Sequence, residues 1–224
     1  MKVLFFLLCF ISVNACEKNL SQPVKEIMDN GENVIELVKS NNAEGIKLAL
    51  ENGADVNTKD SRGRSLLLLA AVGKKIKIAK ILVEYKADVN LQDQQLDSPF
   101  LFAGANGQTE LVKLFLKNGA RFDVFNRYNG TALIPACERG HVETVKVLVN
   151  TEGFPINHVN RLGWNALMEA VVLGDGSLKY QQIVQILKEK GAKDIPDKDG
   201  ITALEHAKSL EYKEIVKILE SQTD

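Results

Sequence analysis

A six-residue phrase that starts with Ser, Thr or Asn and ends with Ala returns five times along the chain. It reads SLLLLA at 65–70, SPFLFA at 98–103, TALIPA at 131–136, NALMEA at 165–170 and TALEHA at 202–207. Successive starts lie 33, 33, 34 and 37 residues apart. A module of this length cannot bury its own apolar face, so it has to stack on its neighbours. The spacing therefore predicts an elongated array of repeats instead of one globular core.

Each unit follows the order turn, helix, reversal, helix, loop. In the fourth unit, residues 126–130 form a turn, Thr131 caps a helix over 132–139, and Gly140 leads into a second helix over 143–150. Apolar residues three or four apart give each helix one buried stripe. We therefore expect an all-α solenoid of about six helix-turn-helix repeats with hairpin-like loops, at about 32–58, 60–91, 93–125, 126–159, 160–196 and 197–222.

These units resemble the ankyrin repeat over nearly the whole chain after residue 30. The resemblance rests on the five phrases, on the reversal Gly140-His141-Val142-Glu143, and on loops such as Asn52-Gly53-Ala54-Asp55-Val56-Asn57. It implies a protein that binds another protein through a preformed surface and that is not an enzyme.

The departures from the repeat pattern also carry predictions. Leu96 occupies the turn position that Gly63, Gly163 and Gly200 fill, so we expect a strained or different turn there. Lys74 stands where a reversal glycine is expected. Unit five carries an insertion, residues 175–179, which either serves a function or is merely tolerated.

Composition and motifs point away from catalysis and from nucleic acid. The 224 residues are 45% hydrophobic and 25% charged, with a formal net charge of −1, so no strong field attracts nucleic acid. Phosphate-binding, dinucleotide-binding and metal-ligand spacings are absent, and we expect no cofactor, metal or small-molecule substrate. The histidines at 141 and 206 are interpreted as structural, and Cys137 as a buried hydrophobic residue.

The first residues have the pattern of an export signal. Lys2 precedes the apolar run 3–13, and Asn14-Ala15-Cys16 follows it. The segment resembles the signal of bacterial lipoproteins, which implies cleavage after residue 15 and a lipid on Cys16; the alternative is an ordinary cut that leaves a free thiol. We thus predict a signal peptide at 1–15, a tether at 16–29 and a repeat domain at 30–224.

The most informative exposed residues fall in adjacent turns. In ankyrin proteins the turn tips and the first helices line a concave binding surface. Here we expect a protein-binding face that prefers an acidic partner and is centred on Arg62, Arg64, Arg127, Tyr128, Arg161 and Trp164. The helix positions expected beside this face are Val72, Ala105, Asn106, Glu138, Arg139, Val172 and Leu173. The alternative is that the arginines only solvate the surface and that Trp164 covers the edge of the core.

Together these features predict a non-enzymatic interaction module that is exported and anchored by lipid at a bacterial cell envelope, in the periplasm or on the outer membrane. A soluble secreted protein is the alternative location. Two other functions stay open, an immunity or inhibitor protein that neutralises a toxin or enzyme, and a structural scaffold for an envelope enzyme.

Overall fold

The computed structural model describes residues 31–221, and within them the chain forms 12 helices in six consecutive pairs. The pairs are α2 (Gly31–Lys39) with α3 (Ala43–Glu51), α4 (Leu66–Val72) with α5 (Ile76–Glu84), α6 (Pro99–Ala105) with α7 (Thr109–Leu116), α8 (Leu133–Glu138) with α9 (Val142–Val149), α10 (Ala166–Val172) with α11 (Leu178–Glu189), and α12 (Ala203–Ser209) with α13 (Lys213–Glu220). The predicted signal peptide and tether lie outside the described residues.

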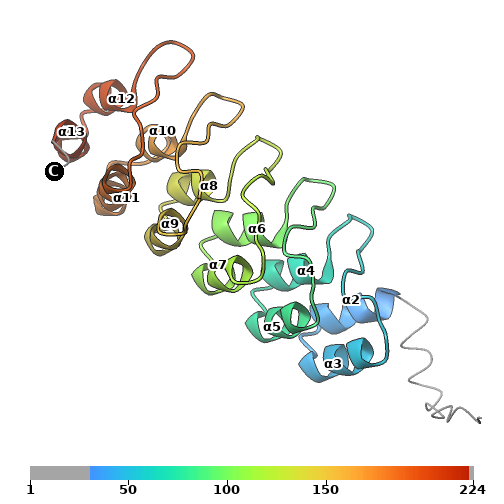
Figure 1. The fold of residues 1–224 in the computed structure, drawn as a ribbon. Coiled ribbons are helices and arrows are strands. Elements are labelled where there is room, and N and C mark those ends of the chain that lie inside the picture. The colour runs from blue at the N-terminus through green and yellow to red at the C-terminus, as the bar shows by residue number, and fades with distance from the viewer. Residues whose placement is uncertain (1–30, 222–224) are drawn as a thin grey trace, which may run out of the picture.

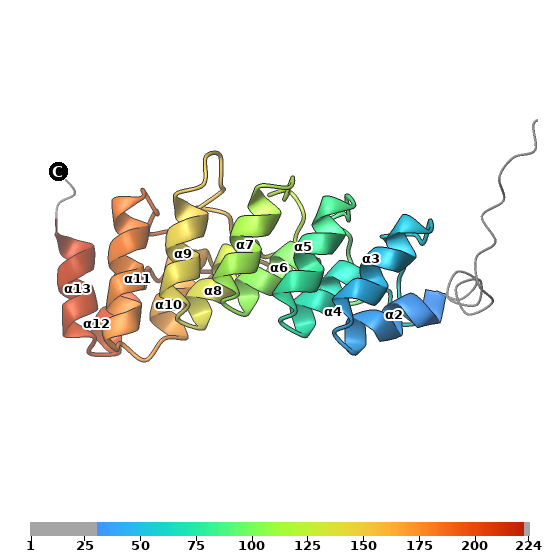
Figure 2. The same cartoon turned by 90° about the horizontal axis from the view of Figure 1, so that it is seen from below.

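The helices form two layers that run the length of the molecule (Figure 1). The first helices of the pairs stack on one another in the order α2, α4, α6, α8, α10, α12, and we call these the inner helices. The second helices stack in the same way from α3 to α13 and are called the outer helices (Figure 2). The loops between pairs project beyond the inner layer (Figure 1). The all-α solenoid expected from the repeat spacing is confirmed.

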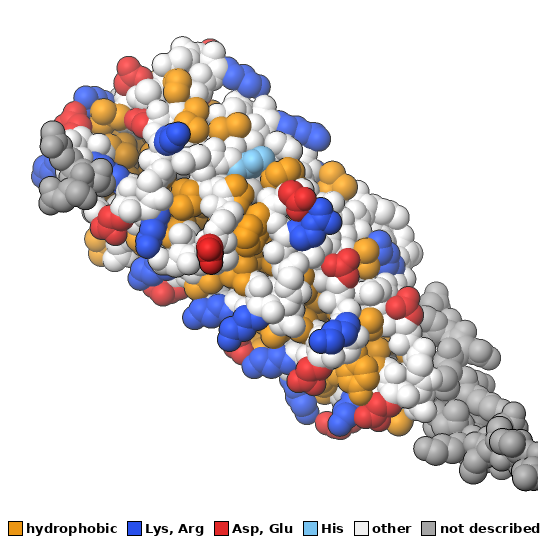
Figure 3. Space-filling model, in the orientation of Figure 1, with side chains coloured by type: hydrophobic (Ala, Val, Ile, Leu, Met, Phe, Trp, Pro, Cys, Tyr) orange, Lys and Arg blue, Asp and Glu red, His pale blue; other side chains and the backbone are white. Residues whose placement is uncertain are grey.

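A continuous apolar seam joins the repeats. The closing Ala residues of the five phrases are fully buried, as are apolar residues of the outer helices such as Leu82, Phe115 and Leu148. Packing is tight enough that a Cβ added to Gly104 would lie 2.6 Å from the Cβ of Ala132 in the next repeat. In Figure 3 hydrophobic side chains run along the middle of the array, and blue side chains gather along the edge of the outer helices. Burying this seam drives the stacking.

Four of the five phrases begin with a helix cap. The side chains of Ser65, Ser98, Asn165 and Thr202 each accept a hydrogen bond from the backbone N–H three residues ahead. The expected cap at Thr131 is wrong, because α8 starts only at Leu133 and the Thr131 hydroxyl is buried without a hydrogen-bond partner among residues 31–221. Pro135 explains the shortened helix, since it has no N–H to donate to the carbonyl of Thr131.

The turns of the second to sixth repeats require left-handed backbone at the same place. The φ angles of Gly63, Leu96, Asn129, Gly163 and Gly200 lie between 59° and 86°. Leu96, at 59°, therefore keeps the backbone shape of the glycine turns, with the strain that a side chain brings there. Lys74, at 52°, does the same at the reversal between α4 and α5.

The insertion of the fifth repeat folds back onto the sixth. The Tyr212 hydroxyl donates to the carbonyl of Gly174 at 3.0 Å, and a Cβ added to Gly176 would lie 2.6 Å from the Tyr212 ring. The inserted residues are thus held against the start of α13. None of the described helices is long and apolar enough to cross a membrane.

Candidate functional site

A groove lies between the turn tips and the inner helices in the middle of the array. It has a volume of about 470 Å³ and extends over the third, fourth and fifth repeats. The tips contribute one wall, with Asp97, Arg127, Tyr128 and Leu162. The ends of the inner helices contribute the other, with Glu138, Arg139 and Leu173, and Phe102, Pro135 and Glu169 lie deeper. We call this surface the central groove.

One side chain fixes the shape of each turn. The residues are Asp60, Asp93, Asn126, Asn160 and Asp197, and the Oδ1 atom of each accepts hydrogen bonds from the backbone N–H groups two and four residues ahead, at 2.8 to 3.1 Å. These bonds add to the main-chain bonds inside each turn, such as the one from the Gly63 N–H to the Asp60 carbonyl at 2.9 Å, and they give all five tips the same local shape. The side chains one and two residues after the Asp or Asn, such as Arg127 and Tyr128 after Asn126, are thus presented at the tip.

In the second repeat, two side chains of the same turn bind each other. Both guanidinium nitrogens Nε and Nη2 of Arg64 donate to Oδ2 of Asp60, at 2.8 and 2.6 Å. The two side chains are only 21% and 9% exposed. Burial raises the pKa of Asp60, but the hydrogen bonds from Arg64 and Arg62 outweigh it and lower the pKa overall. Arg64 therefore stabilises its own turn, which sets it apart from the other residues of the predicted face.

Arg127 and Tyr128 lie together at the tip of the fourth repeat. The guanidinium carbon of Arg127 lies 5.0 Å from the centre of the Tyr128 ring, and Nη1 lies 3.7 Å from Oδ2 of Asp97 in the preceding repeat. Tyr128 is 57% exposed and lines the central groove. The ring is thus held in place by the cation beside it and still faces solvent.

The remaining residues of the predicted face do not line the groove. Arg62 and Arg161 are exposed at their tips, and the backbone N–H of Arg161 donates to the carbonyl of Tyr128 at 2.9 Å. Trp164 is partly buried and packs against the hydrophobic core. Among the helix positions expected beside the face, Val72 and Val172 also lie outside the central groove, while the others line it.

Glu169 is the groove residue that the sequence did not single out. Its side chain comes from the middle of α10 and is only 4% exposed, and the amide nitrogen of Asn160 donates to its Oε1 at 2.7 Å. Burial, together with the charge of Glu138 on α8, raises its pKa to about 7. A signal was present, because the same position of the phrase is apolar in the three preceding repeats, as Leu69, Phe102 and Pro135.

Asp97 is a second carboxyl group of the groove with a raised pKa. Burial is the main cause, followed by the charge of Asp93, and Arg127 partly offsets both. The groove therefore contains three carboxyl groups, of Asp97, Glu138 and Glu169, beside two guanidinium groups, of Arg127 and Arg139. Arg139 is engaged, since its Nη1 donates to the carbonyl of Ala105 at 2.7 Å.

The histidines and the cysteine have structural surroundings. His206 lies 2.8 Å from Oδ2 of Asp197, so it joins α12 to the turn of its own repeat. His141 packs on Gly107, and burial lowers its pKa. Burial raises the pKa of the Cys137 thiol well above its usual value, which keeps it unreactive. Within residues 31–221 no three His, Cys, Asp or Glu side chains gather in a way that could hold a metal ion.

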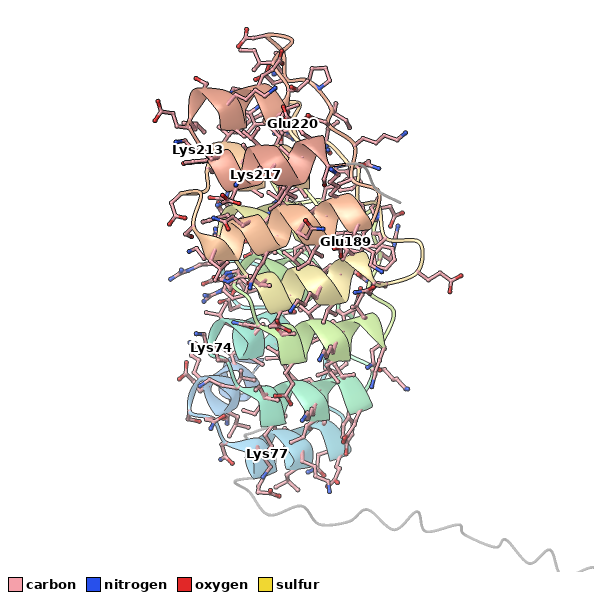
Figure 4. The ribbon with its side chains drawn as sticks, turned by 90° about the vertical axis from the view of Figure 1, so that its left-hand side faces the viewer. Lys74, Lys77, Glu189, Lys213, Lys217 and Glu220 are labelled. Atoms are coloured by element: carbon pink, nitrogen blue, oxygen red, sulfur yellow. The ribbon has the colours of Figure 1, made fainter. Side chains whose placement is uncertain are left out.

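The outer helices present a different surface. Figure 4 shows charged side chains along them, among them Lys77 and Lys217. Many are paired on the surface, as in Lys77 with Glu44 at 3.3 Å, Lys80 with Glu110 at 2.8 Å and Lys217 with Glu214 at 2.7 Å. Mixed, solvated charges of this kind add little energy and favour solubility. The groove side is thus better suited to a partner.

Known proteins match this chain along most of its length. The family model for ankyrin repeats in three copies matches residues 3–93 and 100–193. The ankyrin repeat protein YahD of Escherichia coli (strain K12) is 35% identical over 175 residues, which cover 78% of this chain and 87% of that protein. The protein described here belongs to the ankyrin-repeat family.

Solved structures agree with this assignment. A crystal structure of an ankyrin repeat domain from Acinetobacter baumannii AYE is 43% identical, with a TM-score of 0.82, and covers 85% of this chain and 97% of that one. The ankyrin repeat protein EF0377 is 39% identical with the same TM-score and the same coverage. Membership of this family indicates a protein–protein interaction module.

Proposed function

We propose that the protein is a non-enzymatic binding module that holds a protein partner in the central groove. The observation that carries the proposal is the groove itself, a concave surface of about 470 Å³ with exposed apolar side chains on both walls. Tyr128 is 57%, Leu162 51% and Leu173 49% exposed. Exposed apolar and aromatic groups around a hollow are typical of interaction sites.

The rigidity of the walls supports the same function. Each tip is fixed by two hydrogen bonds to its Asp or Asn side chain, and neighbouring tips are joined, as in the bond from Arg161 N–H to the Tyr128 carbonyl. A surface ordered before binding loses little conformational entropy when the partner arrives. Arg62 and Arg161, exposed beside the groove, favour a partner that also presents acidic groups.

The test compares two double variants with matched exposure. Tyr128→Ala/Leu162→Ala removes the tip wall of the groove, while Leu48→Ala/Leu178→Ala removes exposed side chains on the outer helices. We expect the parent and the second variant to capture the same partner from a cell extract, and the first to lose at least tenfold in affinity. Equal capture by both variants would contradict the proposal.

We further propose export and lipid anchoring through Cys16, with the module at a bacterial cell envelope. The support is the order Lys2, apolar run 3–13 and Val13-Asn14-Ala15-Cys16, which matches a signal with a lipid-attachment cysteine. Metabolic labelling with palmitate should mark the parent protein but not Cys16→Ala. Absence of label in the parent would contradict anchoring and favour an ordinary signal cut with a soluble secreted product.

An immunity protein and a structural scaffold remain the other candidate functions. A scaffold without a discrete contact centre predicts small effects from each groove substitution, whereas the proposal predicts one dominant effect. The same double variants therefore distinguish the scaffold from the proposed binding module.

A further inference from the structure

Two carboxylates of the central groove have no cationic partner in the part of the chain that the structure describes. Glu138, at the end of α8, and Glu169, in the middle of α10, line the groove from neighbouring inner helices. Neither forms an ion pair within residues 31–221, although Glu169 is only 4% exposed. Buried carboxylates are normally paired, because removing a charge from water is costly. A cation supplied from outside residues 31–221 would therefore offset the charge of these two carboxylates.

The hydrogen bonding of Glu169 is also incomplete. In the part of the chain that the structure describes, the only donor to its carboxylate is the Asn160 amide, at 2.7 Å to Oε1. Oε2 receives none, and the side chain lines the groove. Asn160 itself is fixed, because its Oδ1 accepts from the N–H groups of Leu162 and Trp164. The remaining oxygen is therefore held in place and open to a donor from outside the chain.

The guanidinium groups of the groove are committed elsewhere. Arg127 lies over Tyr128 and close to Asp97, and Arg139 donates to the Ala105 carbonyl at 2.7 Å. Asp97 and Ala105 both belong to the third repeat, so both guanidinium groups are directed toward that repeat. Apart from these arginines, the fourth and fifth repeats contribute to the groove the two carboxylates and exposed apolar side chains that include Leu162 and Leu173.

We infer that the central groove receives a lysine or arginine side chain of the protein partner, with its charged end between Glu138 and Glu169 and its methylene groups against Leu162 and Leu173. The inference rests on the proposed function and adds the chemistry of the partner. A long basic side chain suits such a site because its stem is apolar and its head needs an anion. Arginine also supplies paired donors for a carboxylate.

Binding of such a cation should depend on pH. The helices packed against α10 carry Glu138 and the buried thiol of Cys137 on α8, Lys179 on α11, which lies over Tyr180, and His206 on α12, which is bonded to Asp197. Of these groups, Glu138 and Cys137 interact with the charge of Glu169. Because burial and Glu138 raise the pKa of Glu169 to about 7, the carboxylate is largely protonated at about pH 6 and ionised at about pH 8. If only the ionised form binds, the affinity rises about tenfold over this range.

The experiment uses a capped Leu-Arg-Leu tripeptide and its neutral counterpart Leu-citrulline-Leu, titrated into isotope-labelled protein and followed by NMR. At about pH 8 we expect saturable shifts near Glu138 and Glu169 with the arginine peptide and at least tenfold weaker binding of the citrulline peptide. Glu169→Gln keeps the acceptor for Asn160 and should abolish both the preference and its pH dependence. Glu143→Gln, on the outer face, should leave both unchanged.

Equal binding of the two peptides, no saturable binding of the arginine peptide, or an unchanged preference in Glu169→Gln overturns the inference. Glu138→Gln provides a second variant, should reduce the preference, and overturns the inference if it does not. These results test the inference and not the proposed function, which fails separately if the Tyr128→Ala/Leu162→Ala variant captures the partner as well as the parent does.

Discussion

The turn of the second repeat and the turns of the fourth and fifth have the same backbone but use their polar side chains differently. In the second repeat, Asp60 accepts from two backbone N–H groups and from the Arg64 guanidinium, so its carboxylate is paired inside its own turn. In the fifth repeat, Asn160 accepts from two N–H groups, and its amide nitrogen donates to Oε1 of Glu169. The other carboxylate oxygen of Glu169, on the groove, receives no hydrogen bond from residues 31–221. Local satisfaction favours stability, and a free acceptor in a hollow favours binding.

The largest expected effect separates these two designs in stability. Asp60→Ala removes the acceptor of two backbone N–H groups and leaves Arg64 unpaired, so we expect a loss of about 3 kcal/mol in the free energy of unfolding. Asn126→Ala removes the same two N–H acceptors without an ion pair and should cost about half as much. Urea unfolding measures both. Equal losses would show that the Asp60–Arg64 pair adds nothing.

The second prediction concerns the stability cost of the groove carboxyl. Since the pKa of Glu169 is raised from 4.5 in the unfolded chain to about 7 in the fold, the parent loses stability as pH rises from about 4.5 to 7. Glu169→Gln should therefore match the parent at low pH and exceed it by about 2 kcal/mol at pH 8. Unfolding curves at both pH values test this, with exposed Glu152→Gln as the control. A variant less stable at pH 8 would contradict it.

The features that recur from repeat to repeat could be predicted from the sequence. The phrases located the inner helices and the stacked Ala residues, and the spacing of Leu96 with Gly63 located a left-handed turn position. It did not show that the Arg64 side chain is hydrogen-bonded to Asp60 while the Arg127 side chain faces solvent. Both arginines lie in turns, and the directions of their side chains depend on contacts that the sequence pattern does not specify. The break in the apolar pattern at Glu169 is a signal, but it fits an exposed helix position equally well, and only the folded array shows that the side chain is buried beside the groove.

The third prediction compares a cap that forms with one that does not. Ser98→Ala should cost about 1 kcal/mol, because its hydroxyl accepts from the Leu101 N–H at 3.2 Å. Thr131→Val removes a buried hydroxyl that has no hydrogen-bond partner among the described residues, and it should stabilise the protein by about 1 kcal/mol. Thermal unfolding of the two variants checks the signs. A destabilised Thr131→Val would mean that the hydroxyl has a partner after all.

The smallest expected effect comes from backbone strain in the second repeat. Lys74 has a φ of 52° at a position where the next two repeats have Gly107 and Gly140. Relief of left-handed strain in Lys74→Gly should slightly outweigh the greater freedom of glycine in the unfolded chain, giving a gain of about 0.5 kcal/mol. Lys80→Gly, in the middle of α5, should instead lose about 1 kcal/mol. Equal losses of unfolding free energy in both variants would contradict the presence of backbone strain at Lys74.

The most direct test of the account is a hydrogen-exchange footprint of the protein with and without its captured partner. Binding in the central groove predicts slower amide exchange at the tips of the fourth and fifth repeats and at the ends of α8 and α10, with α3, α5 and α7 unchanged. Protection confined to the outer helices would show that the partner binds the other face and would contradict the groove as the binding site.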